Sequence, residues 1–265
     1  MVCDALDPDA VRRAVAEARP EVVVNHLTDL PQELNPRKLK GAYAANDRIR
    51  AVGGSNLAEA ARAAGARRVI AQSVAFLYAP QGGPVKDEDA PIYRDAPPPF
   101  DEGAAAALAM ERATTGTDGV EGVVLRFGFW YGPGTTYAAD GYTAAQVRRR
   151  RFPIVGAGTG MFSFAHVDDV ASATIAALDG GKPGIYNVTD DEPAPVSEWL
   201  PAYAEALGAP RPRRVPVWLA SLLAGRFTPY MMNELRGASN AKARAELGWK
   251  PRHVSWRQGF REALG

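Results

Sequence analysis

The sequence has little cysteine, little histidine and no excess of charge of either sign. Its 265 residues include a single cysteine, Cys3, which excludes an internal disulfide framework and indicates a reducing compartment. The chain has 31 lysine and arginine residues and 30 acidic residues. This balance gives no strong positive electrostatic field that would attract nucleic acid or an anionic membrane. No apolar run can span a bilayer, and the first residues lack the basic start of a signal peptide. We therefore predict a cytoplasmic protein with no nucleic-acid or membrane partner.

What the sequence does contain is an alternation of helical and strand patterns. Short apolar, mostly β-branched runs predict buried strands at 22–24, 69–71, 123–125 and 185–188. Apolar residues recur at helical spacing from about residue 8 to 18, 39 to 64 and 170 to 178, and Asn240 is predicted to cap the last clear helix. This alternation predicts an α/β fold in which a parallel sheet is covered on both faces.

Three segments carry a specific resemblance to a known family. Residues 124–134 read Val-Leu-Arg-Phe-Gly-Phe-Trp-Tyr-Gly-Pro-Gly, residues 164–170 read Phe-Ala-His-Val-Asp-Asp-Val, and residues 247–251 read Leu-Gly-Trp-Lys-Pro. These resemble the Leu-Arg-x-x-x-x-Tyr-Gly-Pro, Phe-x-His-Val-x-Asp and Leu-Gly-Trp-x-Pro motifs of the extended short-chain dehydrogenase/reductases. From Asp4 to about Phe260, the chain is identified as an atypical member of their NAD-dependent epimerase/dehydratase family.

The resemblance implies a Rossmann-type doubly wound parallel sheet with a small C-terminal substrate lobe. We assign residues 1–133 and 166–189 to the NAD(P)-binding domain, and residues 134–165 and 190–265 to the lobe. The glycine-rich turn that holds the pyrophosphate in such folds is not found in this sequence. Because Asp4 resembles the end of the family's third strand, we expect roughly 50–60 residues upstream and a misplaced start codon or truncated gene. Without that segment, weaker cofactor binding is expected.

The family's catalytic Tyr-x-x-x-Lys pair is absent. Counting back eight and four residues from Glu111 gives Gly103 and Ala107, which can neither donate a proton nor lower the pKa of a phenol. Residues 72–78, Gln-Ser-Val-Ala-Phe-Leu-Tyr, resemble the family's Ser-Ser-x-x-Val-Tyr-Gly. We therefore predict Ser73 as the catalytic residue that bonds the substrate's reacting oxygen. The alternative is a polar residue that merely ends a strand.

The resemblance also implies the residues around the cofactor, NAD or NADP, and around the substrate. The predicted cofactor-binding residues are Asp4, Ala5, His26, Leu27, Thr28, Asn46, Arg126, Phe127 and Gly128. The predicted substrate-binding residues are Val74, Ala75, Phe76 and Tyr131. For His26 the alternative is a histidine satisfied by local backbone, and for Asn46 a polar residue on an exposed helix face. No metal site is predicted.

These observations lead to one predicted function and two alternatives. We predict an NAD(P)-dependent oxidoreductase or isomerase of the epimerase/dehydratase type that acts on an unknown small molecule. Phe162 occupies the position at which nucleotide-sugar epimerases carry an arginine, which argues against a nucleotide sugar. The alternatives are a catalytically silent dinucleotide-binding sensor and a truncated product without function. The alanine face at 104–107 permits close helix approach, and the resemblance implies a homodimer.

Overall fold

The computed structural model describes residues 2–30 and 41–264, and its centre is a four-stranded parallel sheet. The strand order is β1-β2-β4-β9, formed by Val22–Asn25, Arg68–Val74, Glu121–Phe127 and Gly184–Val188. The four strands form at the predicted positions and the parallel α/β fold is confirmed, but the predicted burial of the strand at 22–24 is only partly correct. In the described part of the chain, β1 is an edge strand, and its Val24 keeps 37% of its surface exposed.

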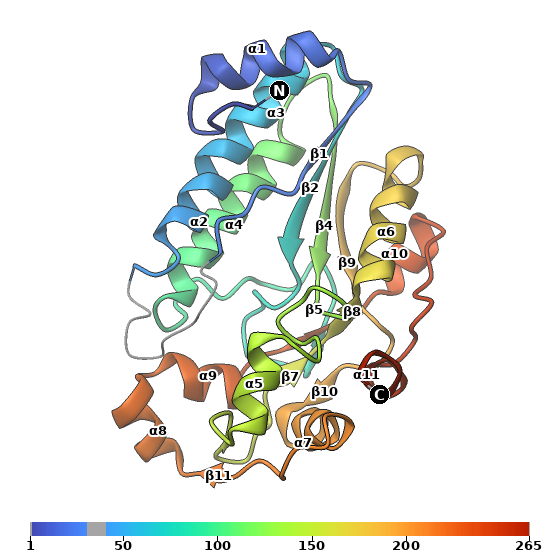
Figure 1. Ribbon diagram of the computed structural model, residues 1–265. Helices are drawn as coiled ribbons and strands as arrows, with labels where there is room; N and C mark the ends of the chain where they lie inside the picture. Colours follow the sequence, from blue (N-terminus) through green and yellow to red (C-terminus); the bar gives the residue numbers. More distant parts are fainter. Residues whose placement is uncertain (1, 31–40, 265) are drawn as a thin grey trace.

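Helices cover both faces of this sheet (Figure 1). On one side lie α1, α2, α3 and α4, formed by Pro8–Ala18, Ala44–Arg48, Gly54–Ala63 and Phe100–Thr115. On the other side lie α6 and α10, formed by Val167–Asp179 and Ala241–Glu246. Strand alternation divides the core accordingly: Val23 and Val69 pack toward α1 and α3, whereas Ile70 and Val123 pack toward α6.

Two helix boundaries show how local sequence controls the first half of the fold. Helix α1 begins as the pattern predicts, because the Asp7 carboxylate accepts hydrogen bonds from the backbone N–H groups of Asp9 and Ala10 at 2.9 and 3.1 Å. The single helix predicted from about 39 to 64 is wrong, because a π turn, Ile49–Gly53, separates α2 from α3. Its predicted start at Leu39 lies outside the described residues.

The close approach of α3 to α4 depends on Gly54. A Cβ atom at this position would lie 2.7 Å from Cγ of Met110, so a larger residue would force the helices apart. The alanines of α4 serve the same purpose, since Ala104, Ala106 and Ala107 are all buried within the chain. Three of the four alanines at 104–107 are thus covered within the chain, and Ala105 is exposed.

The remaining elements gather at the carboxyl end of the sheet (Figure 1). The helices there are α5 (Tyr142–Arg148), α7 (Val196–Ala206), α8 (Val217–Ala224), α9 (Phe227–Asn233) and α11 (Trp256–Leu264). The short strands are β3 (Val85–Lys86), β5 (Phe129–Tyr131), β6 (Ile154–Val155), β7 (Met161–Phe162), β8 (Phe164–His166), β10 (Ala194–Pro195), β11 (Arg214–Val215) and β12 (Gly237–Ala238). One aromatic core joins this region to residues of α4 and the segment after β2. The division into two domains at the predicted residues stays a prediction.

The C-terminal prediction is wrong in two details. Asn240 precedes α10, but its side-chain amide donates to the carbonyl of Thr189 and to Asp191 rather than capping the helix. Helix α10 is also not the last helix, because α11 follows it. None of the helices in residues 2–30 and 41–264 combines the length and apolarity needed to cross a membrane.

Candidate active site

The site is built where the carboxyl ends of β1, β2 and β4 meet the C-terminal region. Open parallel sheets bind ligands at this edge, because successive strand ends and the following loops converge there. The predicted site residues lie mainly in the segments that follow β1, β2 and β4. The structure places some of them at the surface of this edge and others in the interior.

Ser73 belongs to a buried charged cluster, which we call the Ser73 cluster, with Glu111 and Arg126. The Ser73 hydroxyl donates to Oε1 of Glu111 at 2.6 Å, and Nε and Nη2 of Arg126 donate to the two carboxylate oxygens at 2.8 and 2.7 Å. The three residues are 0, 2 and 3% exposed, respectively. Such a bidentate pair with a third hydrogen bond satisfies the buried carboxylate. The geometry therefore argues against the predicted contact of Ser73 with substrate.

The physical reason is the alternation of side chains along β2. Ser73 and Ala75 are buried, whereas Gln72, Val74 and Phe76 keep part of their surface exposed. The predicted substrate contact of Ala75 is therefore not supported, while that of Val74 and Phe76 stays a prediction. The resemblance alone could not show which alternate side chains of β2 point into the core and which remain exposed.

Two tyrosines near the site are also buried in the interior. The hydroxyl of Tyr78 donates to Oδ1 of Asn187 at 2.6 Å and accepts from Nη1 of Arg126 at 3.1 Å. Burial raises the pKa of Tyr78 to about 12, so this phenol stays protonated. Tyr131 is 0% exposed, and burial raises its pKa as well. The predicted contact of Tyr131 with substrate is therefore corrected: its ring fills the core against Phe260 and Phe164.

Three predicted cofactor-binding residues also support the fold from beneath the site. Arg126 is held by Glu111, and Phe127 is 1% exposed in the core under α6. Gly128 is buried where a Cβ atom would lie 2.5 Å from the carbonyl oxygen of Ser163. Packing and hydrogen bonding in the interior thus explain the arginine, the phenylalanine and the glycine of the Leu-Arg-Phe-Gly segment. They do not present side chains to a ligand.

An aromatic wall closes the site on the side of the C-terminal region. Phe76 stacks on Phe129 with ring centroids 4.4 Å apart, and Phe129 stacks on Phe162 at the same separation. Phe76 and Phe129 remain partly exposed, whereas Phe162 is 3% exposed. A wall of this kind suits the flat, apolar part of a small substrate.

The loop after β1 is ordered by side chains from neighbouring elements. The exposed ring of His26 shares a hydrogen bond of 2.7 Å between Nδ1 and Oε1 of Gln72. Oδ1 of Asn25 accepts from the N–H of Leu27, and Oδ1 of Asn46 accepts from the N–H of Asp29. Asn46 is only 4% exposed, so the alternative of an exposed polar residue is wrong. His26, Leu27 and Thr28 are thus presented at the strand end.

The N-terminal segment lies against α3. The carbonyl of Ala5 accepts from Nδ2 of Asn56 at 3.0 Å, and Oδ1 of Asp4 accepts from the N–H of Leu6 at 2.9 Å. Asp4 is exposed and Ala5 is half-buried. Their predicted contact with the cofactor stays a prediction.

Sequence reasoning missed two charged residues beside α4, Asp47 and Arg50. Oδ2 of Asp47 and Nε of Arg50 are buried and have no hydrogen-bond partner. Burial raises the pKa of Asp47 and lowers the pKa of Arg50. A Cβ atom at Gly103 would lie 3.8 Å from Oδ1 of Asp47, so the position predicted to lack the family's tyrosine faces this carboxylate. The only feature of the sequence that pointed to this region was Gly53-Gly54, which permits the close packing of α3 on α4.

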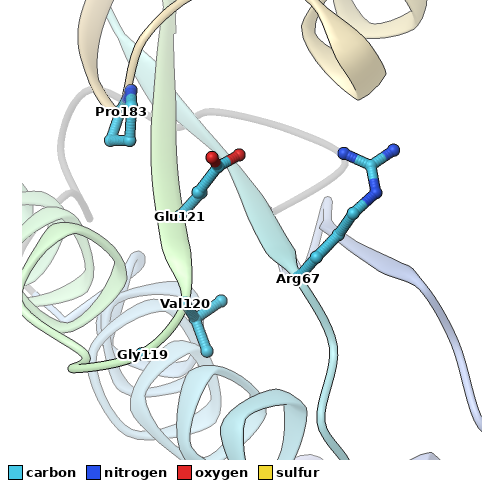
Figure 2. Close-up of a pocket in the computed structure, with 5 residues that line it drawn as sticks. All are labelled: Arg67, Gly119, Val120, Glu121 and Pro183. Atoms are coloured by element: carbon cyan, nitrogen blue, oxygen red, sulfur yellow. The ribbon is translucent and has the colours of Figure 1, made fainter.

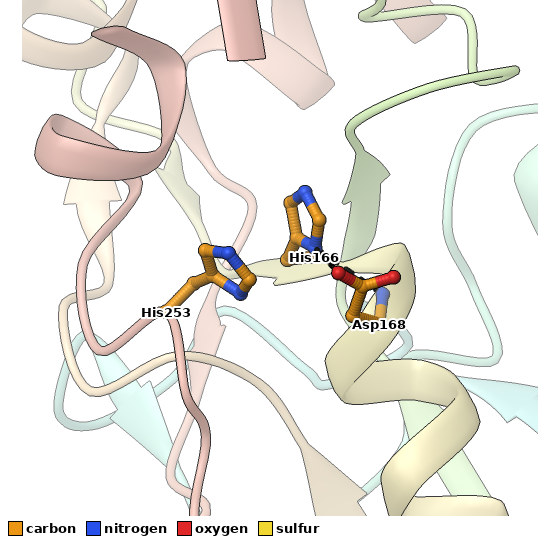
Figure 3. A group of neighbouring side chains, drawn as sticks. All are labelled: His166, Asp168 and His253. Atoms are coloured by element: carbon orange, nitrogen blue, oxygen red, sulfur yellow. Dashed lines mark hydrogen bonds and ion pairs between the residues drawn. The ribbon is translucent and has the colours of Figure 1, made fainter. Parts of the chain in front are cut away.

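A second group of polar side chains comprises His166, Asp168 and His253, whose possible ligand atoms lie within 4.8 Å of one another (Figure 3). The histidine rings lie face to face, with centroids 3.8 Å apart. Nδ1 of His166 accepts from the N–H of Asp168 and caps α6, and Nδ1 of His253 contacts Asp169 at 3.1 Å. These bonds give the group a structural role. The predicted absence of a metal stays a prediction.

A pocket of about 460 Å³ lies at the opposite end of the sheet (Figure 2). Its lining includes Arg67, which directly precedes β2, and Glu121, which begins β4. Because these are the amino ends of the strands, the pocket is separate from the candidate active site.

Comparison with known proteins identifies the family. A model of the NAD dependent epimerase/dehydratase family matches residues 1–189. A 3-diazoavenalumate denitrifying reductase from a Streptomyces species is 51% identical over 261 residues, covering 98% of this chain and 85% of that protein. A 2-alkyl-3-oxoalkanoate reductase of Stenotrophomonas maltophilia is 26% identical over 181 residues, and the match spans 64% of this chain and 54% of that protein.

Solved structures with low sequence identity share the fold. The dTDP-glucose 4,6-dehydratase of Streptomyces venezuelae, solved with NAD, has a TM-score of 0.76 at 19% identity and covers 99% of this chain and 77% of its own. The UDP-glucose 4-epimerase of Thermotoga maritima has a TM-score of 0.74 at 20% identity, covering 99% of this chain and 82% of its own. From the family model and the 51% identical relative together, the chain belongs to the NAD dependent epimerase/dehydratase family.

Proposed function

We propose that this member of the family is an NAD(P)H-dependent reductase that replaces the diazo group of a small organic acid by hydrogen. The observation that carries the proposal is the 51% identity to the 3-diazoavenalumate denitrifying reductase over 98% of the chain. The predicted absence of the catalytic pair, with Gly103 and Ala107 at its positions, agrees with this proposal, because the reaction does not need a proton donor there.

The chemistry explains why a proton donor is unnecessary. When bound, the reduced dinucleotide supplies a hydride. At the diazonium form of the substrate, a C–H bond forms while the C–N bond breaks, and the electron pair of that bond leaves with dinitrogen. The substrate is reduced by two electrons and no oxygen gains charge at the reacting centre. Ketone reduction, in contrast, creates an alkoxide that needs a proton from a group such as tyrosine.

The described residues fit a dinucleotide at this edge. His26 and Thr28 are exposed at the end of β1, and buried polar atoms of Asp47 and Arg50 have no partner. Several buried polar atoms of the described residues lack partners, and Asp47 and Arg50 are the charged residues among them, so we take these two as the place for another group. His26 and Thr28 would border the cofactor, and their loop is held in place by Asn25 and Asn46.

The aromatic wall supplies the substrate side. Val74, Phe76 and Phe129 would pack against the apolar body of the substrate and exclude water from the reacting carbon. Excluding water is important because a diazonium carbon also reacts with water. The Ser73 cluster lies behind this surface and keeps the end of β2 in position.

The test is a reaction with 3-diazoavenalumate and NADPH or NADH, followed by mass spectrometry and dinitrogen release. We expect loss of two nitrogen atoms and gain of one hydrogen. A dinucleotide deuterated on the transferable position should place one deuterium on the carbon that carried nitrogen. Product formation no faster than in a reaction without protein would contradict the proposal. Turnover of a 3-oxoalkanoate instead would favour a ketone reductase.

We also propose a cytoplasmic homodimer. The support for the location is the single cysteine, Cys3. The support for the dimer is Ala105, which is exposed on α4 beside the buried alanines. Light scattering at several concentrations tests the dimer, and a monomer at all of them would contradict it.

A further inference from the structure

Arg50 is a buried cation on the π turn between α2 and α3. Only 8% of the residue is exposed, and its side chain forms no hydrogen bond or ion pair with another described residue. An unpaired buried charge is costly, and a stable fold keeps one only when another requirement demands it. Local π turns are frequent at functional sites, because the extra residue redirects the side chains that follow.

The neighbours of Arg50 place it beside the part of α4 that carries only small residues. Helix α4 and the helical segment α2–α3 run side by side (Figure 1). Asp47 lies against Gly103, and Gly54 lies against Met110. The two residues are the same number of positions apart in the sequence in both contacts. Arg50 lies midway between Asp47 and Gly54, so it is level with Ala106 and Ala107.

The unpaired atoms define the chemistry of the missing ligand. Oδ2 of Asp47 can only accept a hydrogen bond when ionised, and Nε of Arg50 can only donate one. The charges of Glu102 and Glu111 also act on this pair, so an anionic ligand would be repelled. A neutral pair of adjacent hydroxyl groups satisfies both atoms, because each hydroxyl donates and accepts.

We propose that Asp47 and Arg50 bind the two hydroxyl groups of the nicotinamide-side ribose of NAD(P). One hydroxyl donates to Oδ2 of Asp47, and the other accepts from Nε of Arg50. The inference rests on the dinucleotide site of the proposed function. Asp4 and Ala5, which are also predicted to bind the cofactor, lie further along the helix, where the carbonyl of Ala5 accepts from Asn56.

The test is calorimetric titration of the full chain with NADPH, NADH, ADP-ribose and ADP. ADP-ribose carries the second ribose, whereas ADP does not. For Arg50→Met we expect about 10- to 100-fold weaker binding of the dinucleotide and of ADP-ribose, the range for a hydrogen bond to a charged group, and unchanged binding of ADP. Arg50→Lys should recover part of the loss. The matched control is Arg48→Met, because Arg48 is exposed on the same helical segment.

Thermal unfolding separates this role from a structural one. Because the Arg50 side chain forms no hydrogen bond or salt bridge with another described residue, and interacts with Asp47 and Glu111 only through their charges, Arg50→Met should change the melting temperature little. A lower melting temperature with unchanged affinities would overturn the inference, and so would equal weakening of ADP. If the unaltered chain binds no dinucleotide, the proposed function fails as well. If it binds dinucleotide and the variant binds equally, only the inference fails.

Discussion

Two charged clusters lie on the same face of the sheet, and they differ in how their charges are satisfied. In the Ser73 cluster, every oxygen of Glu111 receives a donor from Arg126 or Ser73. In the pair formed by Asp47 and Arg50, one buried atom of each residue has no partner. The difference teaches that a satisfied buried charge supports the fold, whereas an unsatisfied one points to a ligand. Residue type alone does not distinguish the two.

Breaking the satisfied cluster should have the largest effect. Arg126→Met leaves the carboxylate of Glu111 buried without its cation, so we expect the free energy of unfolding to fall by about 3–5 kcal/mol. Urea unfolding measures this loss. Arg62→Met is the control, because Arg62 pairs with Glu59 on the surface and its loss should barely move the midpoint. Similar losses in both variants would contradict the distinction.

Placing a second cation beside Arg50 should have the next largest effect. Ala107 is 0% exposed, and the register of the two helices puts it level with Arg50, so Ala107→Lys should bury a second cation there and cost about 3 kcal/mol of unfolding free energy. Adding Arg50→Met should restore part of it, with a coupling of about 0.5–3 kcal/mol in a double-mutant cycle. Strictly additive effects would show that the two positions are not neighbours.

Removing the hydroxyl of the satisfied cluster should cost less. Ser73→Ala deletes one hydrogen bond to Glu111, so we expect about 1 kcal/mol less stability by urea unfolding. Because the hydroxyl is buried, turnover of the diazo substrate should change little. A drop of about 10²-fold in turnover at unchanged stability would restore Ser73 as the predicted catalytic residue.

The smallest expected effect concerns His166. Burial and the neighbouring charge of His253 lower the pKa of His166. The unfolded chain then binds a proton more readily than the folded one, so stability is full above about pH 6.5 and falls as the pH drops below that value. His166→Gln should flatten the pH dependence of the melting temperature between about pH 7 and 5. An unchanged slope would assign the acid sensitivity to other groups.

The local elements could be predicted from the sequence because their causes are local. The Val22–Val24 run formed an edge strand, Asp7 capped α1, and His166 with its acidic neighbours began α6. The aromatic and glycine pattern at 124–134 identified the family. Periodicity misjudged the long helix, because a π turn leaves the apolar spacing almost unchanged, and it missed α11.

The site was less predictable because it depends on which side of a strand or helix each residue faces. Ser73 and Val74 are equally plausible from the sequence, yet one donates to Glu111 in the core and the other keeps part of its surface exposed. Arginine is usually a surface residue, so the sequence alone predicts an exposed Arg50. Its burial follows from the packing of α3 on α4. The sequence by itself determined the family and the parallel sheet. Only the tertiary structure decided which charges have partners, because hydrogen bonding of a buried group depends on residues distant in the chain.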